Sequence, residues 1–397
     1  MIVNDWKTAD AEKQNRSEYD LLYLINCVIN DVVPQQQRME QMDLRAIYKA
    51  ARFHTLAAIT CMALESADAF RGCTDTELVR KWKECKEKAI RKTLLLDAER
   101  QNICSFMEQE HIWYMPLKGV VLKEFYPKLG MRQMADNDIL FDSTFQNEVC
   151  QWMVHHGYKA VSVGKGNHDV YEKKPVYNFE MHTSLYGKGH DKNWVSYYQD
   201  VKERLIQDKE NKYEYHFTDE DFYIYIITHA YKHYNGSGTG IRSLLDIAVY
   251  LRKKGASLDW EYIFGELKKL HVAEFEENSR NLAEKVFSMD QYYLTEDETG
   301  LLDYFLGAGT YGTMQNRVEK KIREYQPEGN LIKGVTKRRY ILERLFPDES
   351  FYQDYVPFAY RHRWFRPFYL VYRVIRGVVR NGKMIVRELR MVIKTDK

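Results

Sequence analysis

The sequence predicts an α+β protein in which a small mixed β-sheet is inserted between an N-terminal and a C-terminal helical region. Apolar residues recur at helical spacing over residues 1–110 and again over 187–397. Between them, residues 111–186 carry short apolar runs separated by glycines and one helical stretch. Short strands flanked by helices bury their apolar face most simply as one small sheet with helices packed against it.

The N-terminal region, residues 1–110, is predicted to contain three main helices. The first carries an apolar stripe over residues 21–29, and the second covers residues 43–66. The third is long and charged and covers residues 76–110, after a turn marked by Gly72 and Asp75. No residue pattern in this region indicates chemistry, so we expect it to serve as scaffold.

The middle region, residues 111–186, begins with MPLKGVVLKEFYPKLGMRQMADNDILFD. This segment predicts a short strand, a glycine turn, a helix, an arginine and a second strand carrying Asp136 and Asp138. A helix over 144–156 and three further strands follow. The last strand alternates between apolar and polar residues. Phe179 and Met181 are therefore expected on one face, and Glu180 and His182 on the other.

The C-terminal region, residues 187–397, returns to helical patterns. Amphipathic segments precede and follow the loop NGSGTG at 235–240, and weaker helical signals continue to residue 345. The chain ends in a basic segment, which we expect to be a helix.

Composition restricts the class of protein. The chain has 397 residues, 45% of them hydrophobic and 29% charged, which is typical of a globular protein. The net charge of +2 gives no global field that demands a nucleic-acid partner. Six scattered cysteines without a CxxC pair fit a reducing compartment. No apolar run reaches the roughly 18–20 residues of a spanning helix, and charges interrupt the first 30 residues, so we expect a cytoplasmic protein.

Asp136 and Asp138 are the first candidates for chemistry. Residues two apart on a strand point to the same face, with Cα atoms about 6–7 Å apart. Their carboxylates can converge on divalent cations, and Mg²⁺ prefers one or two carboxylates together with substrate phosphates. The pair therefore predicts metal-assisted phosphoryl or nucleotidyl transfer.

Three neighbouring features strengthen this interpretation. Gly119, between a strand and a helix, allows backbone N–H groups to approach a phosphate closely. Arg132 stands four residues before Asp136, where a guanidinium could bind phosphate oxygens with two hydrogen bonds. Glu180, flanked by apolar residues in a later strand, is expected to aim its carboxylate at the same site.

The pattern LKG…YP…G.R…D.D, followed by a strand with E.H, resembles the nucleotidyltransferase superfamily of the DNA polymerase beta type. Within it, the sequence is most similar to a bacterial group of uncharacterised nucleotidyltransferases. The resemblance also covers the flanking helices and much of the chain. The residues that carry it are Leu117, Lys118, Gly119, Tyr126, Pro127, Gly130, Arg132, Asp136, Asp138, Glu180 and His182.

The resemblance implies a nucleotidyltransferase core at 111–186. Asp136 and Asp138 would hold two Mg²⁺ or Mn²⁺ ions, and Glu180 would be the third carboxylate, a metal ligand or a base. Gly119 and its neighbours would hold the triphosphate. The reaction would transfer an NMP from an NTP such as ATP to a hydroxyl of a small molecule, a protein or RNA, with release of pyrophosphate.

The chain departs from the family pattern in two places. Gly119 is followed by Val120 where many members have serine, although Lys118 could supply a compensating charge. Asn137 stands between the aspartates where an apolar residue is usual, so it must be hydrogen-bonded or lie on an open side. These departures motivate an alternative, a catalytically degenerate module that binds a protein or RNA partner.

Two further residues have open roles. His182 either contacts the substrate or faces solvent beside Glu180. Arg242 either joins the nucleotide site, because a glycine-containing loop precedes it, or forms an intrahelical ion pair with Asp246.

The basic tail also has several interpretations. Its cations alternate at spacings of three and four, which draws one cationic stripe along a helix next to an apolar stripe. The helix could cap the domain with its basic side in water, bind RNA or another polyanion, or lie on an anionic membrane surface. The cationic stripe consists of Arg373, Arg376, Arg380, Lys383, Arg387, Arg390 and Lys394.

Overall fold

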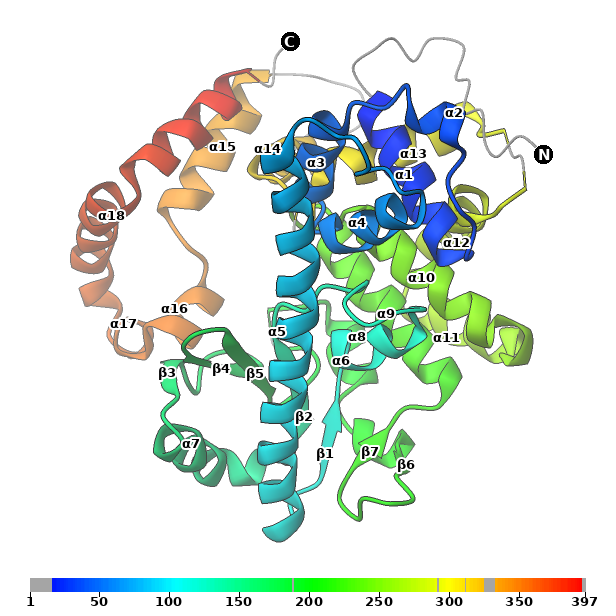
Figure 1. Cartoon of the computed structure of the whole chain (residues 1–397). Helices are drawn as coiled ribbons and strands as arrows, with labels where there is room; N and C mark the ends of the chain where they lie inside the picture. The colour runs from blue at the N-terminus through cyan, green and yellow to red at the C-terminus, as the bar shows by residue number, and fades with distance from the viewer. Residues whose placement is uncertain (1–15, 188, 291–292, 311, 325–332, 395–397) are drawn as a thin grey trace. The chain divides into compact units, whose positions relative to one another are not determined.

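The computed structural model describes residues 16–187, 189–290, 293–310, 312–324 and 333–394. The chain forms two compact units, one from residues 1–231 and 239–310, the other from residues 232–238 and 311–397. The predicted fold class is confirmed, because a small mixed sheet lies in the middle of the chain with helices on either side of it in sequence (Figure 1). The predicted boundaries near residues 110 and 186 remain a prediction.

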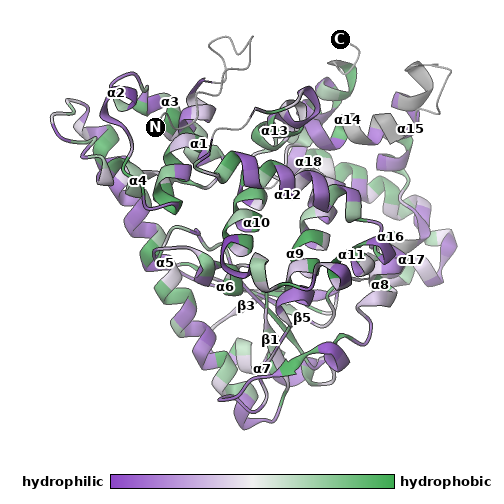
Figure 2. Cartoon of the chain, turned by 90° about the vertical axis from the view of Figure 1, so that its right-hand side faces the viewer, coloured by the Kyte–Doolittle hydropathy of each residue, from purple (hydrophilic) through white to green (hydrophobic). Residues whose placement is uncertain are grey.

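The N-terminal helices of the first unit end in one long helix, α5. Asp75 begins α5 by accepting a hydrogen bond from the backbone N–H of Leu78, which satisfies one free donor of the first turn. Hydrophilic and hydrophobic residues alternate along α5 (Figure 2), so one side can pack while the other is exposed. The helices are α1 (Arg16–Ile29), α2 (Gln36–Met39), α3 (Leu44–Phe53), α4 (Ala57–Ser66) and α5 (Thr76–Gln109).

The central sheet has five strands in the order β1-β2-β5-β4-β3. Strands β2 and β5 are parallel neighbours, whereas the other pairs are antiparallel, so the sheet is mixed. The strands are β1 (Tyr114–Pro116), β2 (Asn137–Phe141), β3 (Lys159–Ser162), β4 (His168–Lys173) and β5 (Tyr177–His182).

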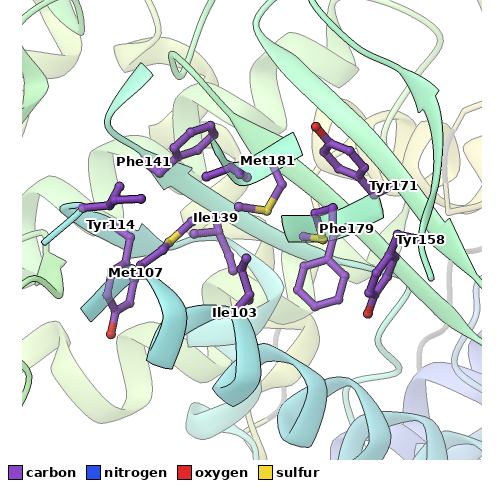
Figure 3. Packing of buried hydrophobic residues seen from close by; sticks show 12 residues of the cluster. Ile103, Met107, Tyr114, Ile139, Phe141, Tyr158, Tyr171, Phe179 and Met181 are labelled. Carbon is purple, nitrogen blue, oxygen red and sulfur yellow. The ribbon is translucent and has the colours of Figure 1, made fainter. Parts of the chain in front are cut away.

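One face of this sheet packs against α5 and α7. Ile139 of β2 and Phe179 and Met181 of β5 meet Ile103 and Met107 of α5 in one buried cluster (Figure 3). Because side chains alternate along a strand, the intervening residues of β2 and β5 project from the opposite face. The predicted alternation of the last strand is therefore confirmed, and it leaves the acidic residues on the face away from α5.

The remaining elements of the first unit connect the strands and add helices after the sheet. Strand β7 joins the edge of the sheet through a hydrogen bond from the N–H of Tyr114 to the carbonyl of Tyr213, just before β7. These elements are α6 (Gly119–Leu122), η1 (Lys123–Phe125), η2 (Ser143–Phe145), α7 (Gln146–His155), α8 (Lys192–Tyr197), η3 (Val201–Arg204), β6 (Ile206–Gln207), β7 (Tyr215–His216), α9 (Asp219–Tyr234), α10 (Ile241–Lys254), η4 (Gly255–Ser257), α11 (Trp260–Lys269), α12 (Ala273–Phe287) and α13 (Glu296–Ala308). The last residues of α9 belong to the second unit.

The second unit is helical and contains the predicted tail helix, α18. Of the apolar residues in that tail, Val392 is buried, whereas Val371 and Ile375 are exposed. Its helices are α14 (Met314–Glu324), α15 (Lys333–Leu345), α16 (Glu349–Tyr355), α17 (Pro357–Arg361), η5 (Arg363–Phe365) and α18 (Arg366–Lys394). Within the described residues, no helix combines the length and the apolar character needed to cross a membrane.

Candidate active site

The site begins at a tight turn that joins β1 to α6. The N–H of Val120 donates to the carbonyl of Leu117 at 3.1 Å, which closes a four-residue turn. Lys118, at its second position, has φ 47° and ψ −113°, a conformation that glycine adopts far more readily than lysine. The N–H of Leu117 donates to the carbonyl of Asp138 at 2.9 Å, so the turn is fixed beside β2. Strained backbone of this kind is typical of functional sites.

Lys118 turns its ammonium group toward Asp138. Its Nζ lies 2.6 Å from Oδ1 of Asp138, and Nε2 of His182 lies 2.9 Å from the same oxygen. Burial alone would raise the pKa of Asp138, but the charge of Lys118 and the hydrogen bond from His182 outweigh it and hold the pKa well below its ordinary range. Asp138 is therefore a buried, ionised carboxylate.

Glu180 is the register partner of Asp138 on the neighbouring parallel strand. Its Oε2 lies 4.0 Å from Nζ of Lys118 and 3.7 Å from Nε2 of His182, so both carboxylates face the same two groups. Burial and the charge of Asp138 raise the pKa of Glu180 to about 7. The structure thus brings Asp138, Glu180, His182 and Lys118 together at one point on the sheet.

Asp136 lies one residue before β2, because the ladder with β5 begins at Asn137. Both aspartates were predicted to lie on this strand, but only Asp138 does. Asp136 immediately precedes its first residue. Burial and the charge of Asp138 raise the pKa of Asp136 to about 6, whereas Lys118 acts in the opposite direction. Asp136 is thus in the same electrostatic field as the other two carboxylates.

Asn137 is fully buried and hydrogen-bonded. Its Nδ2 donates to the carbonyl of Leu96 at 2.9 Å, and its Oδ1 accepts from Nη1 of Arg100 at 3.2 Å. Both partners belong to α5. The polar residue between the aspartates therefore attaches the sheet to this helix, and the departure from the apolar family pattern has a structural explanation.

Arg132 lies beside the turn and forms a buried ion pair. Its Nε and Nη2 donate to the two carboxylate oxygens of Asp246 in α10 at 2.8 and 2.9 Å. The third nitrogen, Nη1, faces Gly119, since a Cβ added there would lie 2.5 Å from it. Gly119 is therefore required for this close approach, and Arg132 has only Nη1 directed to the turn.

Arg242 contacts the same segment from α10. Its Nη2 donates to the carbonyl of Gln133 at 2.5 Å. Burial would raise the pKa of Asp246, but the charges of Arg132 and Arg242 and the hydrogen bonds from Arg132 and Tyr126 hold it below its ordinary range. Arg242 thus supports the backbone between Arg132 and Asp136.

His182 is buried, which excludes the solvent-facing alternative. Burial and the nearby charge of Lys118 lower the pKa of His182 to about 4, so the ring is neutral at pH 7. A neutral imidazole that donates from Nε2 fixes the Asp138 carboxylate.

The analysis of the sequence missed His168. It is the register partner of His182 on the antiparallel strand β4, and the two rings lie with centroids 4.9 Å apart. Together with Glu180, the two histidines form a set whose potential ligand atoms all lie within 4.8 Å of one another. The alternating strand containing His168 was visible in the sequence, but its register with β5 was not.

The donor set fits a divalent cation. Carboxylate oxygens suit Mg²⁺ and Mn²⁺, and imidazole nitrogens extend the fit to transition metals such as Mn²⁺. Burial and the charge of Asp138 raise the pKa of Glu180, so a bound cation would stabilise its ionised form. The donor atoms that converge are those of Glu180, His168 and His182, and Asp138 is the register partner of Glu180 beside them.

A small mixed sheet with acidic residues on neighbouring strands, next to a tight strand-to-helix turn, is the arrangement expected of a nucleotidyltransferase. Residues 40–288 match the family model described as uncharacterised nucleotidyltransferase. The match covers more than half of the chain, so the chain belongs to this family. No match was found among curated proteins or among solved structures.

The strain at Lys118 can be measured by comparing two substitutions. Lys118→Met and Lys118→Gly both remove the ammonium group from Asp138, but only glycine relaxes the positive φ. Glycine costs some stability because it gives the unfolded chain more entropy, but relief of the strain should exceed this cost. We therefore expect Lys118→Gly to be more stable than Lys118→Met by a net of about 1 kcal/mol. Chemical denaturation of the two variants measures the difference, and equal stability would contradict strain at this position.

Proposed function

We propose that the protein is a metal-dependent nucleotidyltransferase that transfers an NMP from an NTP to a hydroxyl acceptor and releases pyrophosphate. The observation that carries the proposal is the register pairing of Asp138 with Glu180, whose carboxylates share Lys118 and His182 next to the turn at Gly119. Family membership supports transfer of nucleotides in general. We further infer that the fold is of the DNA polymerase beta type.

Asp138, Glu180 and Asp136 would hold Mg²⁺ or Mn²⁺, which supplies positive charge to the triphosphate and to the attacking oxygen. Gly119, which lacks a Cβ, allows the guanidinium of Arg132 to lie against the turn, where its Nη1 could meet a phosphate. Lys118 lies between this turn and Asp138, where its ammonium can neutralise charge that develops on the leaving pyrophosphate. Nη1 of Arg132, beside Gly119, would add a second cationic donor.

In the reaction the acceptor oxygen forms a bond to the α-phosphorus while the bond to the bridging oxygen breaks and pyrophosphate leaves. The proton of the acceptor hydroxyl passes to Glu180. In the metal-free protein, burial and the charge of Asp138 raise the pKa of Glu180, which makes it a stronger base than an exposed glutamate. His182 does not exchange this proton, because its role is to hold Asp138 in place.

The alternative, a degenerate module that binds a protein or RNA, rested on Asn137 and Val120. Asn137 is accounted for by its hydrogen bonds to α5. Val120 is buried in a small apolar cluster with Leu96 and Met134, so a serine hydroxyl at this position would have to be accommodated there. Neither residue removes a charged group from the site, and we therefore favour the enzyme. An NTP substrate is consistent with a cytoplasmic location.

Incubation with each of the four labelled NTPs and Mn²⁺ tests the proposal. We expect pyrophosphate release or self-labelling with at least one nucleotide, and loss of this signal by more than about a hundredfold in Asp138→Asn, because Asn cannot supply the charge. The matched control is Glu172→Gln, because Glu172 is an exposed glutamate of β4, the strand next to β5. If no nucleotide reacts and none raises the melting temperature in the presence of Mn²⁺, the proposal is wrong and the binding module is favoured.

A further inference from the structure

The second unit contains a helix, α18 (red in Figure 1), on which many apolar residues are exposed. α18 is kinked at Asn381, and on each side of the kink most of these residues recur three or four positions apart, which places them on one side of that segment. All are exposed, by 42% to 78% of their surface. They form what we call the outer apolar stripe, which consists of Phe368, Val371, Ile375, Val378, Val379, Val386, Leu389 and Ile393.

The opposite side of α18 is fixed within the same unit. Glu388 accepts hydrogen bonds from Tyr340 at 2.6 Å and from Nε of Arg344 at 2.8 Å, both on α15. Val392 packs against Val318 of α14 and against Tyr340. These contacts set the rotation of the part of α18 that follows the kink at Asn381, so the exposure of Val386, Leu389 and Ile393 follows from how this part is attached.

A cationic row runs beside the outer apolar stripe. Its five residues recur at spacings of four, three, four and three, and all are exposed. Glu388 is the one acidic residue in the sequence of α18, and it is turned inward. The exposed side of the helix is therefore apolar and positive without a compensating acid of its own. The cationic row consists of Arg376, Arg380, Lys383, Arg387 and Arg390.

We propose that α18 docks in the plane of an anionic phospholipid surface. The outer apolar stripe would enter the boundary between headgroups and acyl chains, and the cationic row would contact lipid phosphates. Trp364, exposed by 66% just before the helix, is of the residue type that concentrates at membrane interfaces.

An anionic lipid surface satisfies both features of the helix at once. RNA would neutralise the cationic row but would leave the eight apolar side chains in water. A bilayer whose headgroups are negative is complementary to the helix in both polarity and charge.

Flotation of the full chain with vesicles tests the proposal. One set contains phosphatidylcholine alone and the other contains phosphatidylcholine mixed with phosphatidylglycerol. We expect binding to the anionic vesicles to exceed binding to the neutral ones at least tenfold and to weaken with added salt.

Two variants separate the contributions. Val379→Glu places an acid in the most exposed position of the outer apolar stripe, and Arg380→Gln with Arg387→Gln removes two charges from the cationic row. Each is expected to lower binding to anionic vesicles at least tenfold. Val154→Glu, at an exposed valine of α7 in the first unit, is the matched control and should bind like the parent.

Several outcomes would overturn the proposal. These are failure of the parent to float with anionic vesicles, unchanged flotation of Val379→Glu, or tight binding of homopolymeric RNA that Val379→Glu does not weaken. A dimer in sedimentation that Val379→Glu dissociates would assign the stripe to a second copy instead. None of these results depends on NTP turnover, so the proposed function is tested separately.

Discussion

Replacement of Glu180 by glutamine is expected to abolish nucleotidyl transfer while leaving the protein folded and, at pH 8, more stable than the parent. The amide keeps the size of the side chain but supplies neither a negative charge for the cation nor a base for the acceptor hydroxyl. Removal of a general base typically lowers rates by about a hundredfold to ten-thousandfold, and loss of the metal ligand adds to this. Pyrophosphate release with the nucleotide that the parent uses measures the effect.

The gain in stability follows from the raised pKa. An unfolded glutamate ionises near pH 4.5, but burial and Asp138 raise the pKa of Glu180 to about 7. Between these values the folded protein binds more protons than the unfolded chain, so this residue makes the metal-free protein less stable as pH rises from 4.5 to 7. Above pH 7 the loss is complete and is on the order of 3 kcal/mol, which glutamine avoids.

Melting temperatures in EDTA at pH 5 and pH 8 test this reasoning. The variant and the parent should melt at similar temperatures at pH 5 and diverge at pH 8, with the variant higher. Mn²⁺ should then raise the melting temperature of the parent at pH 8 but not that of Glu180→Gln. If Glu172→Gln, in the exposed position of β4, gave the same divergence, the effect could not be assigned to the site.

The sequence was sufficient for the parts of this site that depend on local periodicity. Alternation along the last strand separated Glu180 and His182 from Phe179 and Met181, and the structure confirms that separation. Asp138 and Glu180 were also expected to meet. Periodicity of two specifies which face a side chain occupies but not which strand lies beside it.

The parts that could not be predicted depend on register and on distant pairing. His168 joins the site because β4 and β5 form a hairpin in which His168 faces His182. The short connection between the strands sets that register, and its conformation was not predicted from the sequence. Asn137 was a departure from the family pattern until α5 supplied its partners. Asp246 was expected to pair with Arg242 four residues away, but its two carboxylate oxygens bind Arg132 across 114 positions of sequence.

That distant pair gives the largest expected effect on stability. Substitution of Asp246 by asparagine should lower the free energy of unfolding of the first unit by about 3–5 kcal/mol, because it leaves the guanidinium of Arg132 buried without its anion. It also weakens a contact with the hydroxyl of Tyr126, which donates to Asp246 at 2.7 Å. Arg132→Met with Asp246→Leu should recover part of the loss, since neither charge then remains buried.

A second ion pair of α10 provides the control for this prediction. Lys254 and Asp219 lie 2.8 Å apart, but their side chains are 36% and 45% exposed, against 10% and 13% for Arg132 and Asp246. Lys254→Met should therefore change stability by at most about 1 kcal/mol. Thermal unfolding of the three variants compares the pairs directly. If Asp246→Asn lowered stability no more than Lys254→Met does, the pair between Arg132 and Asp246 would not be what holds the segment from the Gly119 turn to Asp136 against α10. The whole guanidinium of Arg132 would then be available to bind the nucleotide.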